Sequence, residues 1–382
     1  MTKEYMVLAP GPVHLHPQVQ QLLSAQTIHH RTPEFDEIFN RSLKNLKYIF
    51  STENDCYILT STGSGGMECL LVNVLNPGES VLCIDSGKFG ERWAEMAEVF
   101  GGKAINYKVP WGQSADPEIV KKYLTENPQI KIVICQATET STGAKHPIQK
   151  IGEIIKSYSD VLFLVDGITA LGAYPLKMDE FHIDGLVGGS QKSFMLPTGL
   201  SFVSFSKKAW LKIDQAKTPR FYFDIRREKA SNKKGESFFS SNVTLIRALD
   251  WVLTEFKNKS LDTCFNDIKK RQQSAMAFAK GWGLSVYPDH PSESLTVIKT
   301  PENLDSQKIR TELEQKHQIT IMGGQDQLKG KILRIGHMGY LPAELMIKMY
   351  NHLSDVLINA DPKTFNKEHK SQVIAECQKI LN

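Results

Sequence analysis

Between residues 55 and 205 short β-branched runs alternate with longer amphipathic stretches, and this pattern restricts the fold more than any other feature. The predicted strands are 56–60, 81–84, 132–135, 161–165 and 202–205, and the predicted helices between them are 66–75, 89–101, 117–125 and 147–158. Continuously apolar strands separated by helices predict an α/β fold whose mostly parallel sheet is covered by helices on both faces. Ligands of such sheets bind at the carboxyl ends of the strands.

The pattern changes in the last third of the chain, where a smaller α+β domain is predicted. Its expected strands are 294–299, 319–322 and 332–335, and its expected helices are 305–317, 342–358 and 363–381. Because 382 residues exceed one hydrophobic core, we expect an N-terminal arm (1–20), a large domain (21–258) and a small C-terminal domain (259–382). A long helical pattern over 242–281 joins the two domains, and the lysine-rich stretch 226–234 is predicted to be a solvated loop.

The composition argues against several classes of protein. The formal net charge is only +4 and the basic residues are scattered among acidic ones, so nucleic-acid binding has no electrostatic support. The N-terminal apolar run is too short for a signal peptide, and the best membrane-span candidate, 161–176, contains Asp166, so a cytoplasmic location is expected. The six cysteines are spread singly, which predicts no metal site, and four of them lie in apolar segments typical of buried thiols.

An Asp at the end of one apolar strand and a Lys after the next short strand carry the chemistry of the sequence. Asp166 follows the run 161–165, and Lys192 lies in a segment of small residues, 188–193. A Lys that loses its proton in a partly desolvated pocket can bind an aldehyde, and a buried Asp can keep a ring nitrogen protonated. Together the two residues indicate pyridoxal phosphate chemistry, whereas either one alone is equally consistent with a turn cap or a solvated loop lysine.

Three further features are consistent with such a site. The small residues around Thr62, Gly63 and Ser64 lie between a predicted strand and a predicted helix, where free backbone N–H groups can bind a phosphate, and they lack the Gly-Lys-Ser/Thr of a P-loop. Phe89 follows the next strand and either stacks on an aromatic ring or packs in the core. Arg334 is the one cation in the apolar strand 332–335, where it either binds a substrate carboxylate or lies on the surface.

In combination these motifs resemble the class V aminotransferases of fold type I, which depend on pyridoxal phosphate. The resemblance covers nearly the whole chain, from the segment 9–12 through 165–167 and 189–192 to 333–336. It is closest to the alanine–glyoxylate and serine–pyruvate (serine–glyoxylate) aminotransferase group.

The resemblance also implies a role for each position of the motifs. Lys192 would be the Schiff-base lysine and proton carrier, and Asp166 the partner of the ring nitrogen. The resemblance implies that the cofactor phosphate is bound near Thr62, Gly63, Ser64 and Gln191. Phe89 would stack on one face of the cofactor ring and Ile168 on the opposite face. Thr140 would lie near the ring hydroxyl. Arg334 would bind the α-carboxylate of the substrate.

The chain departs from the family pattern in the segment 238–243, which replaces a more usual Thr-Pro segment, and at Ser64, where some relatives carry His. In the family the first of these segments completes the phosphate site of the neighbouring subunit, so the resemblance implies a homodimer with Ser240 as the cross-subunit contact. Arg31 either binds a distal anion of the substrate, as a corresponding Arg does in phosphoserine aminotransferases, or pairs with an acid such as Glu34 or Asp36.

The expected activity is transfer of an amino group from a small L-amino acid, alanine or serine, to a small 2-oxo acid, glyoxylate or pyruvate. Phosphoserine, aspartate or an aminophosphonate as donor would need only a modest change of the pocket. A cysteine desulfurase is a rival interpretation, although Cys264 and Cys377 lie in helical patterns rather than on a loop. A non-catalytic subunit with this fold is a further alternative, but it would not need Lys192 as a proton carrier.

Overall fold

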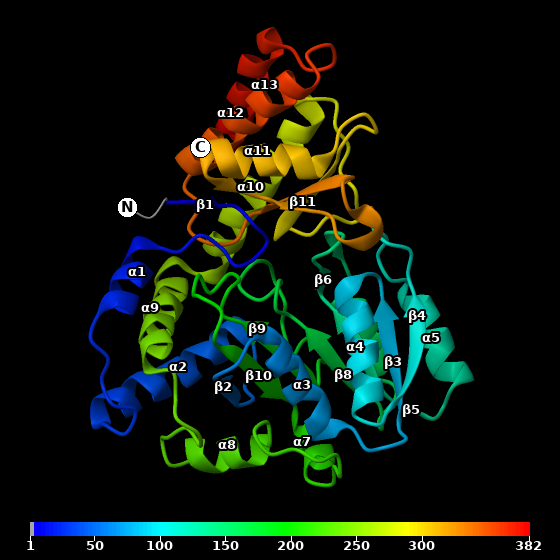
Figure 1. The fold of residues 1–382 in the computed structure, drawn as a ribbon. Helices are drawn as coiled ribbons and strands as arrows, with labels where there is room; N and C mark the ends of the chain where they lie inside the picture. Colours follow the sequence, from blue (N-terminus) through cyan, green and yellow to red (C-terminus); the bar gives the residue numbers. More distant parts are fainter. Residues whose placement is uncertain (1–3) are drawn as a thin grey trace.

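The computed structural model describes residues 4–382. Its large sheet has seven strands in the order β2-β10-β9-β8-β5-β3-β4 (Figure 1). The strands are β2 (Cys56–Leu59), β3 (Ser80–Asp85), β4 (Lys103–Lys108), β5 (Ile130–Gln136), β8 (Leu162–Asp166), β9 (Gly185–Gly189) and β10 (Ser201–Phe205). Strand β10 runs antiparallel to both of its neighbours, and all other pairs in this sheet are parallel. The predicted α/β fold with a mostly parallel sheet is confirmed.

Alternate residues of the central strands enter two separate hydrophobic cores, one on each face of the sheet. Phe163 and Val165 of β8 pack with one group of helices, and Leu162 and Leu164 pack with another. The first group includes α2 (Pro33–Phe50), α6 (Ile148–Ile155) and α9 (Val243–Lys259), and the second includes α3 (Gly63–Val74), α4 (Lys88–Val99) and α7 (Lys207–Ile213). Because both faces are covered, every residue of β8 is buried, which explains the apolar run 162–165 that precedes Asp166.

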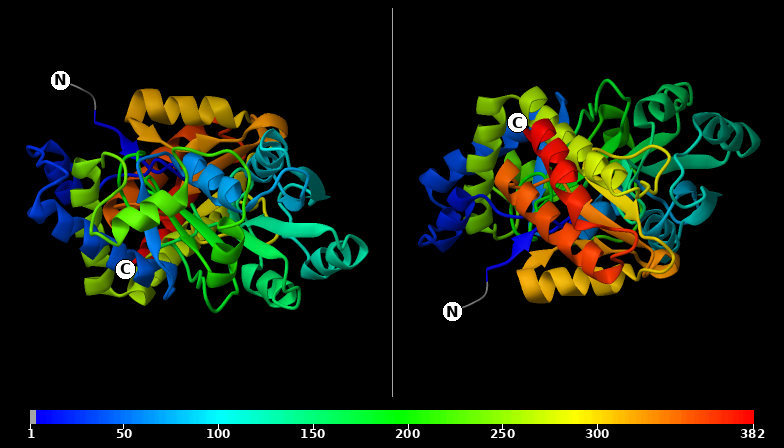
Figure 2. Two further views of the ribbon diagram at one scale, coloured as in Figure 1. Left: turned by 90° about the horizontal axis from the view of Figure 1, so that it is seen from below. Right: turned by 90° about the horizontal axis from the view of Figure 1, so that it is seen from above.

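A third core lies above the large sheet in Figure 1, between a small sheet and the C-terminal helices. The small sheet has the order β11-β14-β13. Its strands are β11 (Leu295–Lys299), β13 (Met322–Gly323) and β14 (Ile332–Gly336), and the helices are α10 (Leu261–Gly281), α11 (Ser306–His317), α12 (Ala343–Ala360) and α13 (Lys367–Leu381). In the view from above, α13 lies beside both α10 and α12 (Figure 2).

The N-terminal segment joins this upper part of the molecule. Strand β1 (Met6–Val7) pairs in parallel with β12 (Ile319–Thr320), and the side chains of Met6 and Leu8 are buried in the third core. From there the chain passes across the large domain to α1 (Pro17–Ser24) (Figure 1). The domain boundaries after residues 20 and 258 stay predictions.

The structure corrects four local expectations. The lysine-rich stretch 226–234 is largely helical rather than a loop, because α8 (Ile225–Asn232) is capped by the Asp224 side chain and buries Ile225 and Glu228. The expected strand 319–322 is two short strands, β12 and β13, that pair with different partners. The helical pattern 242–281 is broken at Ser260, whose φ is +67°. Strand β4 was missed because it is an edge strand with mostly polar, partly exposed residues.

Other observations concern the thiols, the membrane and helix α5 (Pro117–Glu126). Cys56, Cys69, Cys83 and Cys135, the four thiols in apolar segments, are buried as predicted. No helix within residues 4–382 is both long enough and apolar enough to cross a bilayer. Helix α5 begins at the predicted place because Asp116 accepts a hydrogen bond from Glu118 N and Pro117 occupies its first turn.

Candidate active site

A cavity of about 260 Å³ lies at the carboxyl edge of the large sheet and brings most of the predicted site residues together. Its lining comprises Gly11, Pro12, Thr62, Gly63, Ser64, Met67, Phe89, Arg92, Thr138, Thr140, Asp166, Ile168, Thr169, Gln191, Lys192 and Thr198. These residues come from the turns after β2, β3, β8 and β9, from the β6 (Thr138–Glu139) turn and from the N-terminal segment. The cavity therefore lies where ligands of parallel sheets bind.

Lys192 follows strand β9 and is almost completely buried. Its Nζ donates a hydrogen bond to the carbonyl oxygen of Pro10 at 2.5 Å. Burial lowers the pKa of the Lys192 amine to about 8, the Asp166 charge opposes this shift and the Arg334 charge adds to it. The neutral, nucleophilic form of the amine is therefore more populated near neutral pH than in a solvated lysine, although the protonated form still predominates at pH 7.

Gly11 makes room for this lysine. Its φ is +130°, a conformation that L side chains rarely adopt, and a Cβ on Gly11 would lie 2.5 Å from Lys192 Nζ. The segment 9–12 contributes to the family resemblance, but none of its residues Pro10, Gly11 and Pro12 was predicted to belong to the site. Because these residues are about 180 positions away from Lys192, only the fold shows that they form one wall of the cavity.

Asp166 ends strand β8 and is buried. One carboxylate oxygen, Oδ1, accepts a hydrogen bond from Ile168 N at 2.9 Å. Burial raises the pKa of Asp166 to about 6, the Ile168 N–H opposes this shift, and the nearby Glu139 charge adds to it. The Lys192 charge also acts on Asp166, but it lowers the pKa of this carboxyl less than burial raises it. A buried carboxylate whose charge is only partly compensated is expected to favour a cationic ligand atom.

The amino end of α3 forms a neighbouring wall. Thr62 is the N-cap residue, but its side chain makes no capping hydrogen bond, which leaves N–H groups of the first turn for another acceptor. A Cβ on Gly63 would lie 2.8 Å from Ile168, so the backbone of α3 is seated directly on this side chain. The Oε1 atom of Gln191 is buried there without a hydrogen-bond partner in the described chain. The free N–H donors of the first turn suit a phosphate, whereas the Gln191 oxygen is an acceptor and needs a donor instead.

Among the described residues, two cations line the cavity, Lys192 and Arg92. Arg92 lies on α4 one turn after Phe89, with its guanidinium carbon 5.0 Å from the centre of the Phe89 ring. It also donates a hydrogen bond to Ser64 Oγ at 3.2 Å. Phe89 itself lines the cavity and belongs to none of the hydrophobic cores, so the alternative of a core aromatic does not describe it. Arg92 was missed because an Arg on an amphipathic helix is usually solvated.

Arg334 lies in β14 and is buried, so the alternative of a surface strand residue does not describe it. Its Nε donates to Gly323 O and its Nη1 to Thr140 O, both at 2.9 Å. Burial lowers the pKa of Arg334 to about 10, and the Glu139 charge opposes this shift. The cation therefore reaches the cavity wall at Thr140 from the C-terminal sheet.

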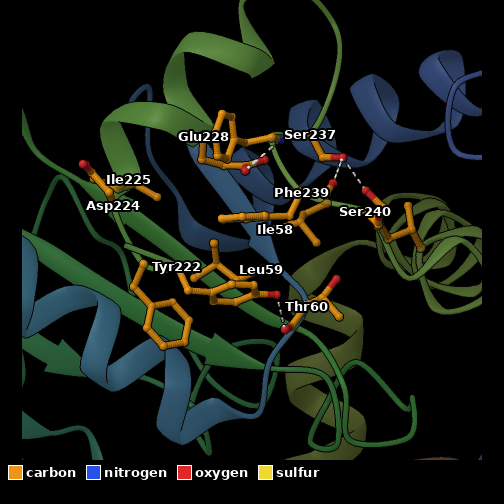
Figure 3. Close-up of a pocket in the computed structure, with 14 residues that line it drawn as sticks. Ile58, Leu59, Thr60, Tyr222, Asp224, Ile225, Glu228, Ser237, Phe239 and Ser240 are labelled. Atoms are coloured by element: carbon orange, nitrogen blue, oxygen red, sulfur yellow. Dashed lines mark hydrogen bonds between the residues drawn. The ribbon is translucent and has the colours of Figure 1, made fainter. Parts of the chain in front are cut away.

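Three predicted site residues do not line this cavity: Arg334, which only contacts its wall through the Thr140 carbonyl oxygen, and Ser240 and Arg31. Ser240 lines a separate pocket with Tyr222, Glu228 and Phe239, shown in Figure 3. Arg31 forms an exposed ion pair with Glu236 at 2.6 Å, rather than with Glu34 or Asp36. The predicted roles of Ser240 and Arg31 are not tested by a single chain and stay predictions.

The residues present fit pyridoxal phosphate. A buried amine with a lowered pKa, a buried carboxylate with a raised pKa and an uncapped helix amino end surround one cavity. These groups match the aldehyde, the ring nitrogen and the phosphate of that cofactor. The fold and the site thus define a pyridoxal phosphate-dependent transferase of fold type I.

Comparison with known proteins agrees with this class. The family model described as aminotransferase class-V matches residues 18–353. The chain belongs to the class V aminotransferase family, and it is a pyridoxal phosphate-dependent aminotransferase.

Three similar proteins show how far the likeness extends. The "Soluble hydrogenase 42 kDa subunit" of Anabaena cylindrica is 33% identical over 96% of each chain. The L-aspartate–glyoxylate aminotransferase of Paracoccus denitrificans is 30% identical over 89% of this chain and 88% of its own. The crystal structure of the alanine–glyoxylate aminotransferase of Nostoc sp. superposes with a TM-score of 0.89 at 27% identity, over 94% of this chain and 96% of the other.

Proposed function

We propose that this aminotransferase moves an amino group from a small L-amino acid, alanine or serine, to a small 2-oxo acid, glyoxylate or pyruvate. The observation that carries the proposal is the single cavity of about 260 Å³ in which Lys192, Asp166 and the amino end of α3 meet. Two of the similar proteins are named as glyoxylate aminotransferases, with aspartate and alanine as donors, which supports a glyoxylate acceptor.

Lys192 is the proposed catalytic residue. When bound, pyridoxal phosphate withdraws electrons from the substrate and makes the α-C–H bond acidic. Lys192 Nζ would hold the cofactor aldehyde and, once the amino donor has displaced it, carry the α-proton. Its lowered pKa suits both tasks, because the neutral amine is the nucleophile and the proton acceptor. The Pro10 carbonyl limits where Nζ can lie in the cofactor-free state.

The other lining residues would bind and orient the cofactor. Asp166 would hold the proton of the ring nitrogen, and its burial strengthens that ion pair. Phe89 and Ile168 would pack on the two faces of the ring, and Thr140 would contact the ring hydroxyl. Thr62, Gly63, Ser64 and Gln191 are the proposed phosphate contacts.

Arg334 would bind the α-carboxylate of the substrate. Its guanidinium is already fixed by hydrogen bonds to the backbone oxygens of Gly323 and Thr140, so little side-chain freedom remains to be lost on binding. A desolvated guanidinium pairs strongly with a carboxylate, and its planar geometry orients the substrate.

We also propose a homodimer in which Ser240 approaches the phosphate site of the partner. An aromatic patch supports this part of the proposal. Phe221, Tyr222 and Phe238 are 66%, 42% and 37% exposed in the single chain, and Phe239 packs among them. The patch adjoins the pocket of Figure 3, where the Tyr222 hydroxyl donates to the carbonyl oxygen of Thr60. Exposed apolar patches of this kind mark interaction sites.

Aspartate, phosphoserine or an aminophosphonate is the alternative donor class. Aspartate and phosphoserine carry a second anionic group, and an aminophosphonate carries a phosphonate instead of a carboxylate. Among the described residues that line the cavity, Arg92 is the cation besides Lys192. Arg31 would contribute only if its ion pair with Glu236 opened. Comparison of donors therefore decides the substrate class.

The first experiment is the visible spectrum of the purified protein, followed by single half-reactions with alanine, serine, aspartate and phosphoserine. Fastest bleaching by alanine or serine is expected, whereas a preference for the acidic donors would establish the alternative. Lys192→Ala should abolish turnover, because none of the other described residues that line the cavity carries an amine that could replace Nζ. Near-normal activity of Lys192→Ala, or a wild-type protein that takes up no pyridoxal phosphate, would refute the proposal.

A further inference from the structure

Glu139 is a fully buried carboxylate whose hydrogen bonds converge on the wall of the cavity. Its Oε2 accepts from the backbone N–H groups of Phe89 and Gly90, both at 3.1 Å, and from Gln136 Nε2 at 3.0 Å. Its Oε1 accepts from Ser141 N at 3.1 Å and from Ser141 Oγ at 2.6 Å. Charge-assisted hydrogen bonds of this kind stabilise a buried carboxylate and hold their donors in place.

These bonds cap helix α4 from a distant part of the chain. The N-cap residue of α4 is Gly87, which has no side chain to accept the first N–H groups. The carboxylate of Glu139 replaces such a cap, and Ser141 Oγ accepts the N–H of Lys88 at 3.3 Å. A negative charge at a helix amino end is favoured by the helix dipole. A Cβ on Gly87 would lie 2.7 Å from Glu139 Cδ, so the two segments are in close contact.

The turn that carries Glu139 also contacts Arg334. The carbonyl oxygen of Thr140, the next residue, accepts from Arg334 Nη1 at 2.9 Å. The Thr140 hydroxyl lies 2.9 Å from that of Thr169, which also lines the cavity. One short turn thus contacts the elements that carry Phe89 and Arg334, although these residues come from different domains.

We propose that Glu139 is a positioning residue for the reaction. By capping α4 it fixes the backbone of Phe89, and through its turn it fixes the distance between the Phe89 ring and the Arg334 guanidinium. The ring plane of the cofactor and the carboxylate of the substrate are thereby set relative to one another. This inference rests on the proposed function, since the roles of Phe89 and Arg334 belong to it.

The test is Glu139→Gln, which keeps the shape of the side chain but replaces one acceptor oxygen by an N–H donor that faces other donors. We expect the variant to load pyridoxal phosphate as the wild type does, and kcat for the best donor to fall by about tenfold or more with KM changed less than about threefold. The visible circular dichroism of the bound cofactor should weaken at equal loading. Glu118→Gln, the same change at an exposed helix start, is the matched control and should match the wild type.

The decisive measurement is a double-mutant cycle with Phe89→Ala. If Glu139 acts through Phe89, Glu139→Gln should lower kcat by less than about threefold in the Phe89→Ala protein, since the interaction has already been lost. An equal loss of kcat in both backgrounds, or an unchanged kcat and circular dichroism in the single variant, would overturn the inference.

If Glu139→Gln does not fold, Ser141→Ala takes its place in the cycle, because it removes only the hydroxyl that bonds to Glu139 and to Lys88 N. The same coupling to Phe89→Ala is expected with a smaller loss of kcat, and full additivity would again overturn the inference. A wild-type protein without transaminase activity would instead refute the proposed function itself.

Discussion

At the scale of single residues, burial brings the pKa values of the two central groups towards each other. The pKa of Lys192 is lowered to about 8 and that of Asp166 is raised to about 6, in both cases chiefly by desolvation. Both shifts favour the neutral forms, although at pH 7 Lys192 is still mostly protonated and Asp166 mostly ionised. In the proposed function, a cationic ring nitrogen would stabilise the ionised form of Asp166.

The lowered pKa of Lys192 predicts the pH dependence of cofactor uptake. The neutral amine is the nucleophile, so the rate at which cofactor-free protein gains visible absorbance with pyridoxal phosphate should rise with pH and level off above about pH 8. Stopped-flow absorbance between pH 6 and 10 measures it. A rate that still rises steeply towards pH 10 would contradict the shift, since it would indicate an ordinary, solvated lysine.

At the scale of elements, helix α3 is unusual because its first turn contains three glycines, which are poor helix formers. The close contacts explain them. A Cβ would lie 2.8 Å from Ile168 at Gly63, 2.9 Å from Phe223 at Gly65 and 2.7 Å from Val187 at Gly66. The first turn of α3 is thus packed closely against these three side chains, at the place proposed for the phosphate.

Gly63→Ala should therefore weaken cofactor binding. The new methyl group would displace Ile168 or move the amino end of α3, and the Kd for pyridoxal phosphate should rise by about tenfold or more, on the order of 1.4 kcal/mol. Fluorescence titration of cofactor-free protein measures this. Gly281→Ala is a matched control, because its Cβ would lie 2.9 Å from Val373 in the C-terminal core, and it should alter stability but not the Kd. Equal effects of both changes on the Kd would refute this account.

At the scale of the whole molecule, the cavity is assembled from segments with different cores. The N-terminal segment pairs with β12 in the C-terminal part, yet its Pro10 accepts the hydrogen bond of Lys192, which follows strand β9 of the large sheet. Arg334 reaches Thr140 from the small sheet in the same way. Any change in the relative position of the two parts would therefore alter the site.

The proposed homodimer gives a prediction at this scale. The double substitution Phe221→Ser, Phe238→Ser should convert a dimer into a monomer with little change in the stability of the fold, because both side chains are already more than one-third exposed in the single chain. Sedimentation velocity measures the mass. Val99→Ser, at a residue 72% exposed on α4, is the control and should remain dimeric. A wild-type protein that sediments as a monomer would contradict the dimer and, with it, the role of Ser240.

The sequence by itself determined the strands and the chemistry at their ends. The runs at 132–135 and 161–165 predict strands because a strand buried on both faces needs consecutive apolar residues, a local property. Asp166 and Lys192 were identified because polar residues directly after such strands lie at one edge of a parallel sheet. The edge strand β4 has no run of consecutive apolar residues, so the sequence did not predict it. Helix α8 was not predicted either, because its packing depends on the burial of Ile225 and Glu228 in the folded chain.

Only the tertiary structure decided which distant residues complete the site. The hydrogen bond from Lys192 to Pro10, the carboxylate of Glu139 at the amino end of α4 and the pairing of Arg31 with Glu236 each join segments far apart in sequence. Such contacts depend on the register and packing of whole elements. They stabilise the protein only after folding has brought the two distant segments together. Local residue pattern therefore predicts the groups that do the chemistry, whereas packing decides the partners that orient them.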